Sequence, residues 1–146
     1  MEGSIEIFFG TRALVAVLAG IIIGVERSIT LHPAGIKTIV LVSLGSSMFT
    51  SLAFYLHEIY PTSDPNRIIG QIITGIGFLC AGVIFRERGK VGGLTSSTMV
   101  WSSAALGTIA GSGLVLVPIF GAITIVCVTL LTRRIEKFIQ DKENKK

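Results

Sequence analysis

Charged residues are scarce in this sequence. Asp, Glu, Lys and Arg supply 15% of its 146 residues, whereas hydrophobic residues supply 50%, and the mean hydropathy is +0.74. The charges fall in short runs that separate long apolar stretches, instead of being spread as they are over a soluble surface. This distribution excludes an ordinary soluble domain and predicts a membrane protein.

Cysteine and histidine are also scarce, and neither is arranged for chemistry. Cys80 and Cys127 lie in separate apolar stretches without CxxC spacing, so neither a disulfide framework nor a metal site is indicated. His32 and His57 lack the spacing of metal ligands. The sequence contains no nucleophile elbow, HExxH motif or phosphate-binding loop. We therefore expect no metal, no cofactor and no enzymatic activity.

The excess of positive charge is small and does not predict nucleic-acid binding. The formal net charge is +4, and Lys and Arg lie between the apolar stretches and in the final residues, without aromatic residues interleaved on a basic face. Such positions are typical of residues that contact lipid headgroups and set membrane orientation. The lipid bilayer is therefore an expected partner, and nucleic acid is not.

Five apolar segments predict transmembrane helices. They cover about 8–25, 36–57, 68–85, 98–113 and 114–132. Asp64 followed by Pro65 predicts an N-cap and a first helical residue for the third helix. The break at Gly111-Ser-Gly113 divides the last two segments, because one continuous helix would run roughly 50 Å against a bilayer core of about 30 Å. We expect a transmembrane domain over 1–132 and a charged cytoplasmic tail over 133–146 that continues the last helix.

The distribution of Lys and Arg predicts the orientation. Two lie in 27–37, three in 86–90 and six in the tail, whereas 58–67 has one and 111–113 has none. Five spans with the N-terminus outside place the three basic segments together in the cytoplasm, as the positive-inside rule requires. The predicted fold is an all-α polytopic bundle of about five transmembrane helices with a cytoplasmic C-terminus.

Small residues recur at four-residue spacing, which lets membrane helices approach closely. The pairs are Gly20 and Gly24, Gly70 and Thr74, Gly77 and Ala81, and Gly107 and Gly111. Packing within one bundle is the favoured interpretation, and a dedicated homo-oligomer face is the alternative. Since the third segment carries small residues on more than one face, we expect it to be central in the bundle.

A few polar groups near the apolar segments are candidates for function. Glu26 and Arg27 directly follow the first segment, and Arg12 lies within it. The hydroxyl cluster 95–98 precedes the fourth segment, where one hydroxyl can cap the helix, or the group can form a polar lining or bind an anion. For Arg86 and its charged neighbours, headgroup contact is the favoured interpretation and function the alternative.

Three linked motifs resemble the MgtC/SapB family of bacterial inner-membrane proteins. They are GVERSITLHPAGIKTIVLVSLGSSMF, DPNRIIGQIITGIGFLCAGVIFR and VGGLTSSTMVWSSAALGTIAGSG, and together they cover about Gly20 to Gly113. The candidate functional residues are Glu26, Arg27, Pro33, Asp64, Arg67, Gln71, Gly75, Gly77, Gly82, Arg86, Thr95, Trp101 and Ser102.

The sequence departs from the family pattern at several positions. Cys80, Gly92 and Lys37 stand where the family usually has glycine, arginine and arginine. Thr95 and Ser102 occupy positions where some members carry asparagine and cysteine. These two positions are implicated in the virulence members. The chain also resembles short members without the cytoplasmic C-terminal domain that some members append.

The resemblance implies a role in growth under magnesium limitation and acid stress, and virulence members restrain the F-type ATP synthase. Our leading hypothesis is a regulator that contacts another membrane protein, with ATP synthase as a candidate. The alternatives are a transporter or channel for magnesium, protons or a small solute, and a scaffold or homo-oligomeric subunit. A continuous cavity lined by the polar residues and Glu26 would favour transport, and polar groups satisfied by helix packing would favour the regulator.

Overall fold

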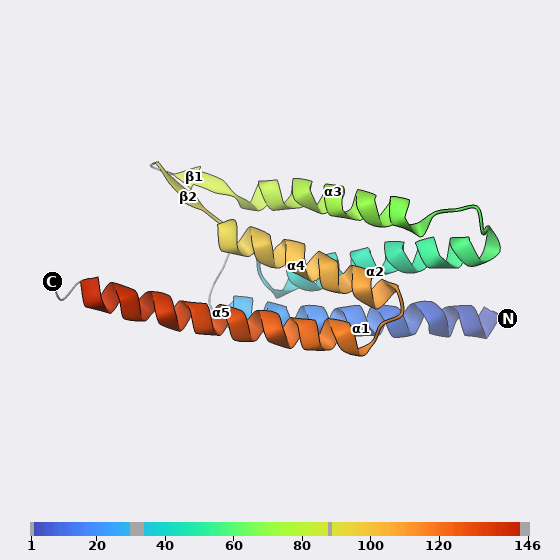
Figure 1. The fold of residues 1–146 in the computed structure, drawn as a ribbon, viewed down its shortest axis with the longest axis horizontal. Helices are drawn as coiled ribbons and strands as arrows, with labels where there is room; N and C mark the ends of the chain where they lie inside the picture. Colours follow the sequence, from blue (N-terminus) through green and yellow to red (C-terminus); the bar gives the residue numbers. More distant parts are fainter. Residues whose placement is uncertain (1, 30–33, 88, 144–146) are drawn as a thin grey trace.

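The apolar segments fold into antiparallel helices that share one long axis (Figure 1). The computed structural model describes residues 2–29, 34–87 and 89–143. In chain order the described elements are α1 (Glu2–Ile29), α2 (Ile36–Ile59), α3 (Pro65–Val83), β1 (Phe85–Glu87), β2 (Lys90–Gly92), α4 (Leu94–Gly111) and α5 (Leu116–Glu143). The two termini lie at opposite ends, and the β hairpin lies at the end from which α5 projects (Figure 1).

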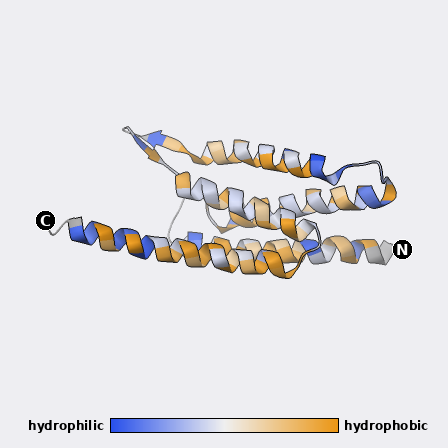
Figure 2. Ribbon diagram, viewed as in Figure 1, coloured by the Kyte–Doolittle hydropathy of each residue, from blue (hydrophilic) through white to orange (hydrophobic). Residues whose placement is uncertain are grey.

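Four described helices are long and apolar enough to cross a membrane. The spans are Ile5–Ser28, Ile36–Ile59, Pro65–Val83 and Leu116–Lys142. The remaining helix, α4, has 18 residues and is rich in serine, threonine and glycine. Hydrophilic residues gather on the hairpin and on the far end of α5 (Figure 2). The expected all-α membrane bundle is confirmed, although α4 does not reach the hydropathy of the other helices.

The interior of the bundle is the contact region of α1, α2 and α4, where small residues let the helix backbones approach closely. A Cβ added at Gly20 would lie 3.0 Å from Val40 Cα on α2. A Cβ at Gly107 would collide with the Ser43 carbonyl, and one at Gly111 would lie 2.5 Å from the Ser47 carbonyl oxygen. These contacts confirm bundle packing for the Gly20/Gly24 and Gly107/Gly111 pairs, because they bring both helices against α2.

Buried serines connect the same three helices. Ser43 Oγ on α2 donates to the Ala16 carbonyl on α1 at 2.8 Å. Ser103 Oγ on α4 donates to the Ile39 carbonyl on α2 at 2.6 Å. Ser51 Oγ donates to the carbonyl of Gly111 at 3.3 Å. A buried hydroxyl is costly in an apolar medium unless it is bonded, so these pairings stabilise the close approach.

The prediction that the third segment is central in the bundle is wrong. Ile76 and Cys80 are the buried residues of α3. A Cβ added at Gly70 or Gly77 would meet no heavy atom of the described chain within 4 Å. The central position belongs to α4, because Ser103 donates to an α2 carbonyl and Ser51 on α2 donates to the Gly111 carbonyl of α4. Large apolar side chains such as Phe78 on α3 can face lipid.

The helix boundaries follow local signals in most places. Asp64 Oδ1 accepts a hydrogen bond from the Asn66 amide at 2.9 Å, which confirms the predicted N-cap. Gly113 has φ +98 between α4 and α5, as the predicted break requires. α5 continues unbroken to Glu143, which confirms that the charged tail extends the last helix.

The start of α4 differs from the prediction. The helix begins at Leu94, and its N-cap is Gly93 with φ +82 and no side-chain cap. A Cβ at Gly93 would collide with the Val83 carbonyl, so the approach of α3 requires glycine here. Capping by the hydroxyl cluster was therefore a wrong interpretation, because these residues lie inside the first turns. The antiparallel pairing of β1 and β2, with Arg86 opposite Val91, was also not predicted.

Candidate functional site

A charged cluster closes one end of the bundle. Glu26 Oε1 accepts a hydrogen bond from Arg133 Nη2 at 2.8 Å. Arg27 Nη1 lies 3.8 Å from Glu26 Oε2, and Arg27 Nη2 donates to Ser96 Oγ at 3.0 Å. Arg27 is 0% exposed and Glu26 8%. The cluster therefore joins the last turn of α1 to the first turn of α4 and to α5.

The sequence of α1 explains this arrangement. Two successive helical residues point about 100° apart, so Glu26 and Arg27 can reach different neighbours. A buried guanidinium needs a counter-charge and hydrogen-bond partners, and Glu26 and Ser96 supply them. The sequence singled out Glu26 and Arg27 but missed Arg133. The usable signal was that each of these charges directly follows an apolar segment, so parallel helices would bring the segment ends together.

Arg12 stabilises the opposite end of α4. Its Nη1 donates to the Gly111 carbonyl at 2.6 Å, and its Cζ lies 3.5 Å from the centroid of the Phe8 ring. A cation at a helix C-terminus pairs with free carbonyls and with the negative end of the helix dipole. The charge that the sequence places within a span thus has a structural partner, and α4 contacts arginine from α1 at both ends.

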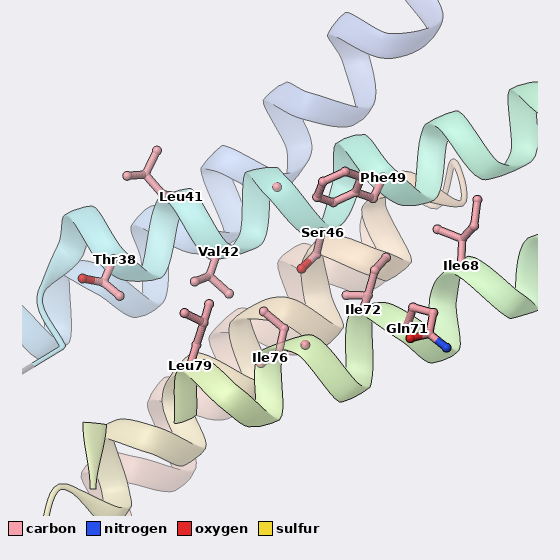
Figure 3. Close-up of a pocket in the computed structure, with 12 residues that line it drawn as sticks. Thr38, Leu41, Val42, Ser46, Phe49, Ile68, Gln71, Ile72, Ile76 and Leu79 are labelled. Atoms are coloured by element: carbon pink, nitrogen blue, oxygen red, sulfur yellow. The ribbon is translucent and has the colours of Figure 1, made fainter. Parts of the chain in front are cut away.

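A groove runs between α2 and α3, with a volume of about 670 Å³. Val42 and Ser46 project from α2 toward Ile72 and Ile76 on α3 (Figure 3). The full lining is Thr38, Leu41, Val42, Gly45, Ser46, Phe49, Ile68, Gln71, Ile72, Gly75, Ile76 and Leu79. Apart from a few polar groups the lining is apolar, so the groove suits an apolar occupant.

A second hollow, polar and about 490 Å³ in volume, continues from the Phe49 end of this groove. Its lining is Thr62, Ser63, Asp64, Arg67, Ile68 and Gln71. Ile68 and Gln71 line both spaces. The structure therefore brings four candidate residues together around one continuous surface: Asp64, Arg67, Gln71 and Gly75.

The other candidate residues are dispersed. Gly77 and Gly82 lie on exposed parts of α3, Arg86 is exposed on β1, and Thr95 is exposed at the start of α4. Ser102 is half-buried. Trp101 is 52% exposed and lines a cleft of about 220 Å³ between α3 and α4. Pro33 lies outside the described residues.

Polar groups between the helices mostly bond to one another or to backbone carbonyls. Within 2–29, 34–87 and 89–143, no group of three or more His, Cys, Asp or Glu side chains could hold a metal ion. Ser97 Oγ donates to the Cys80 carbonyl at 3.1 Å, and Cys80 Sγ contacts the Ser97 carbonyl at 3.3 Å. Several buried polar groups are thus satisfied by neighbouring helices, whereas Gln71 is exposed on α3 and lines the groove beside α2.

Long apolar helices around a polar interior of small residues define a multi-pass membrane protein of the helical-bundle class. The comparison with known sequences identifies the particular family. The MgtC family model matches residues 13–138, so the chain belongs to the MgtC family.

Proteins with similar sequences occur in several bacteria. Protein SapB of Bacillus subtilis is 40% identical over 105 residues, which are 68% of this chain and 45% of the relative. Protein MgtC of Brucella abortus (strain 2308) is 35% identical over 125 residues, covering 86% and 51%. The putative magnesium transporter YhiD of Escherichia coli is 35% identical over 120 residues, covering 79% and 56%.

The chain spans about half the length of the curated relatives that it matches. No solved structure matches it. The expected resemblance to the MgtC/SapB family is confirmed, and the activity of the longer relatives is a separate matter.

Proposed function

We propose that this chain is a regulator in the bacterial inner membrane that acts through helix contacts on another membrane protein during adaptation to magnesium limitation, acid stress or virulence. The F-type ATP synthase is the candidate partner. One observation carries the proposal: α3 presents a row of small residues, Gly70, Thr74, Gly77 and Ala81, on an exposed face.

Small residues let another membrane helix approach closely, and this bundle already uses that device between α4 and α2. On α3 the same spacing has open space around it within the described chain. Phe78, which is 82% exposed, lies beside this row and could pack against an arriving helix. An outward face of this kind supports contact with a partner in the plane of the membrane.

The test is a reconstitution of purified protein with F-type ATP synthase in liposomes. We expect ATP-driven proton pumping to fall when the chain is present, and the two proteins to co-purify. Gly77→Leu should weaken both effects, because it closes the approach without meeting the bundle. Unchanged pumping together with absent co-purification would reject ATP synthase as the target.

Transport of magnesium, protons or a small solute is the second candidate. Its support is the name of the Escherichia coli relative, a putative magnesium transporter. Against it, Ser43, Ser51 and Ser103 are bonded to backbone carbonyls of neighbouring helices, which favours a packed interior. Liposomes loaded with a magnesium or proton indicator would decide the question, and flux that depends on the protein would support transport.

We also propose that the N-terminus lies outside and the C-terminus in the cytoplasm. The arrangement supports this orientation, because the hairpin and the end of α5 lie at the same end of the bundle (Figure 1) and both carry basic residues. A reporter fused after Lys146 should be active only in the cytoplasm. Reporter activity on the outer side would contradict this orientation.

A further inference from the structure

We propose that the groove between α2 and α3 binds one phospholipid, whose acyl chain lies between the helices and whose headgroup carries both a phosphate and a primary amine, as in phosphatidylethanolamine. Arg67 binds the phosphate and Asp64 the amine. This inference goes beyond the proposed function and uses a different face of α3 from the row that contains Gly77.

The groove has the shape and lining of an acyl-chain site. Gly45 on α2 and Gly75 on α3 line it, and a Cβ at either position would meet no described atom within 4 Å. The missing side chains leave a hollow whose walls include Val42, Ile72 and Ile76 (Figure 3). A volume of about 670 Å³ is in the usual range for small-molecule sites, about 300–1,000 Å³.

The length of the groove suits one acyl chain. On α3 the lining extends from Ile68 to Leu79, a rise of roughly 17 Å at 1.5 Å per residue. This length matches one leaflet of a bilayer core about 30 Å thick. An acyl chain that starts at the headgroup needs about half of the core thickness.

The polar hollow meets the groove at the end where a headgroup would lie. Neither of the ion pairs found in the described part of the chain involves Arg67, and Arg67 is exposed. Ser63 Oγ, also in the lining, is buried and has no hydrogen-bond partner among the described residues. An arginine and a hydroxyl are suitable donors for phosphate oxygens.

Asp64 decides which class of headgroup fits. Its Oδ1 accepts the hydrogen bond from the Asn66 amide, and its other carboxylate oxygen has no hydrogen-bond partner among the described residues. A carboxylate beside an arginine is complementary to a headgroup with an amine beside a phosphate. It opposes the purely anionic headgroup of phosphatidylglycerol, and a quaternary amine cannot donate a hydrogen bond to it.

The test uses tryptophan quenching by lipids with dibrominated acyl chains. Trp101→Phe removes the single tryptophan, and Phe49→Trp places a probe in the groove. The protein is reconstituted in phosphatidylcholine vesicles that contain brominated phosphatidylethanolamine, phosphatidylglycerol or phosphatidylcholine. We expect about fivefold preferential quenching by phosphatidylethanolamine, the effect of one favourable charge contact at the membrane surface. A probe from Phe120→Trp on exposed α5 should show no preference.

Matched variants distinguish recognition of the headgroup from binding of the acyl chain in the groove. Asp64→Asn keeps an N-cap residue, so it should abolish the preference without unfolding α3. Arg67→Gln should abolish it as well, and Arg67→Lys should retain part of it. Gly75→Leu should reduce quenching by all three lipids, whereas Gly77→Leu, which also has open space but does not line the groove, should not.

Three results would overturn the proposal. Equal quenching by the three lipids would exclude headgroup selection. A preference that survives Asp64→Asn would exclude the assigned role of the carboxylate. Absence of quenching at position 49 by any brominated lipid would mean that protein, either a second copy or another helix, covers the groove. None of these results depends on whether the chain regulates ATP synthase.

Discussion

α3 and α4 are alike in length, and both carry small residues at four-residue spacing, yet they lie in opposite environments. α3 has 19 residues and α4 has 18. A Cβ at Gly107 of α4 would collide with the backbone of α2, while one at Gly77 of α3 would meet no described atom within 4 Å. Small-residue spacing therefore marks a helix that can pack closely, but it does not identify the helix that does.

The difference between the two helices lies in their hydroxyls. On α4, Ser103 donates across the helix boundary to α2. On α3, Thr74 donates at 3.0 Å to the Gly70 carbonyl of its own helix. A hydroxyl bonded to its own helix needs no neighbour, whereas one that bonds another helix holds the two together. Arginines of α1 also hold α4 at both ends, whereas among the described residues no arginine of α1 bonds α3.

The sharpest test of this comparison is leucine at matched glycines. Gly107→Leu should prevent folding, because overpacking costs about 1–3 kcal/mol even where side chains can yield, and here the obstacle is backbone. Gly77→Leu should be neutral or stabilise the protein by up to about 1 kcal/mol, since glycine is a poor helix former. Thermal unfolding in detergent measures both, and equal behaviour would contradict the comparison.

The next largest effect is expected at the charged cluster. Glu26→Gln removes the counter-charge of buried Arg27, and breaking a buried ion pair costs about 3–5 kcal/mol. Arg133, the other partner of Glu26, is 40% exposed, so Arg133→Gln should cost no more than about 1 kcal/mol. Chemical unfolding measures the loss of unfolding free energy in each of the two variants. A larger loss for Arg133→Gln would place the stabilising contact on α5.

At the other end of α4, Arg12→Leu should destabilise the protein by about 2 kcal/mol, the upper value for a cation at a helix C-terminus. The variant also leaves the Gly111 carbonyl without its arginine partner. Protection of the last-turn amides of α4 against hydrogen exchange should fall, while that of α3 stays unchanged. Equal loss of protection in both helices would indicate a general unfolding instead.

The smallest effect is expected where α3 and α4 are joined. Ser97→Ala removes the hydrogen bond to the Cys80 carbonyl and should cost about 1 kcal/mol. The bond contributes to the attachment of α3, so hydrogen exchange should increase in α3 and remain slow in α4. Faster hydrogen exchange in α4 than in α3 would contradict this role and would mean that the bond stabilises α4 in the interior.

Local signals predicted much of the fold. Asp64 and Pro65 marked the start of α3, the Gly111-to-Gly113 break separated the last two helices, and the charged tail extended α5, because each depends on neighbouring residues alone. The start of α4 was not predictable in this way. Gly93 begins the helix with a positive φ that the approach of Val83 demands, and that approach is a long-range contact.

The sequence predicted only part of the candidate site, because its contacts also join distant segments of the chain. Glu26 and Arg27 stood out as charges at the end of an apolar segment, but their partners Ser96 and Arg133 come from distant segments. Likewise Arg67 and Gln71 were recognised by motif, while the groove that unites them depends on how α2 lies against α3.

Apolar length, small-residue spacing and linked motifs identify a helical membrane protein of the MgtC family, because each of them is a property of the chain itself. Which helix is enclosed and which faces outward follows from the packing of the helices in three dimensions. The physical reason is that lipid tails are as apolar as leucine, so hydropathy cannot distinguish a face that meets lipid from one that meets protein. Close contacts at Gly107 and open space at Gly77 make that distinction.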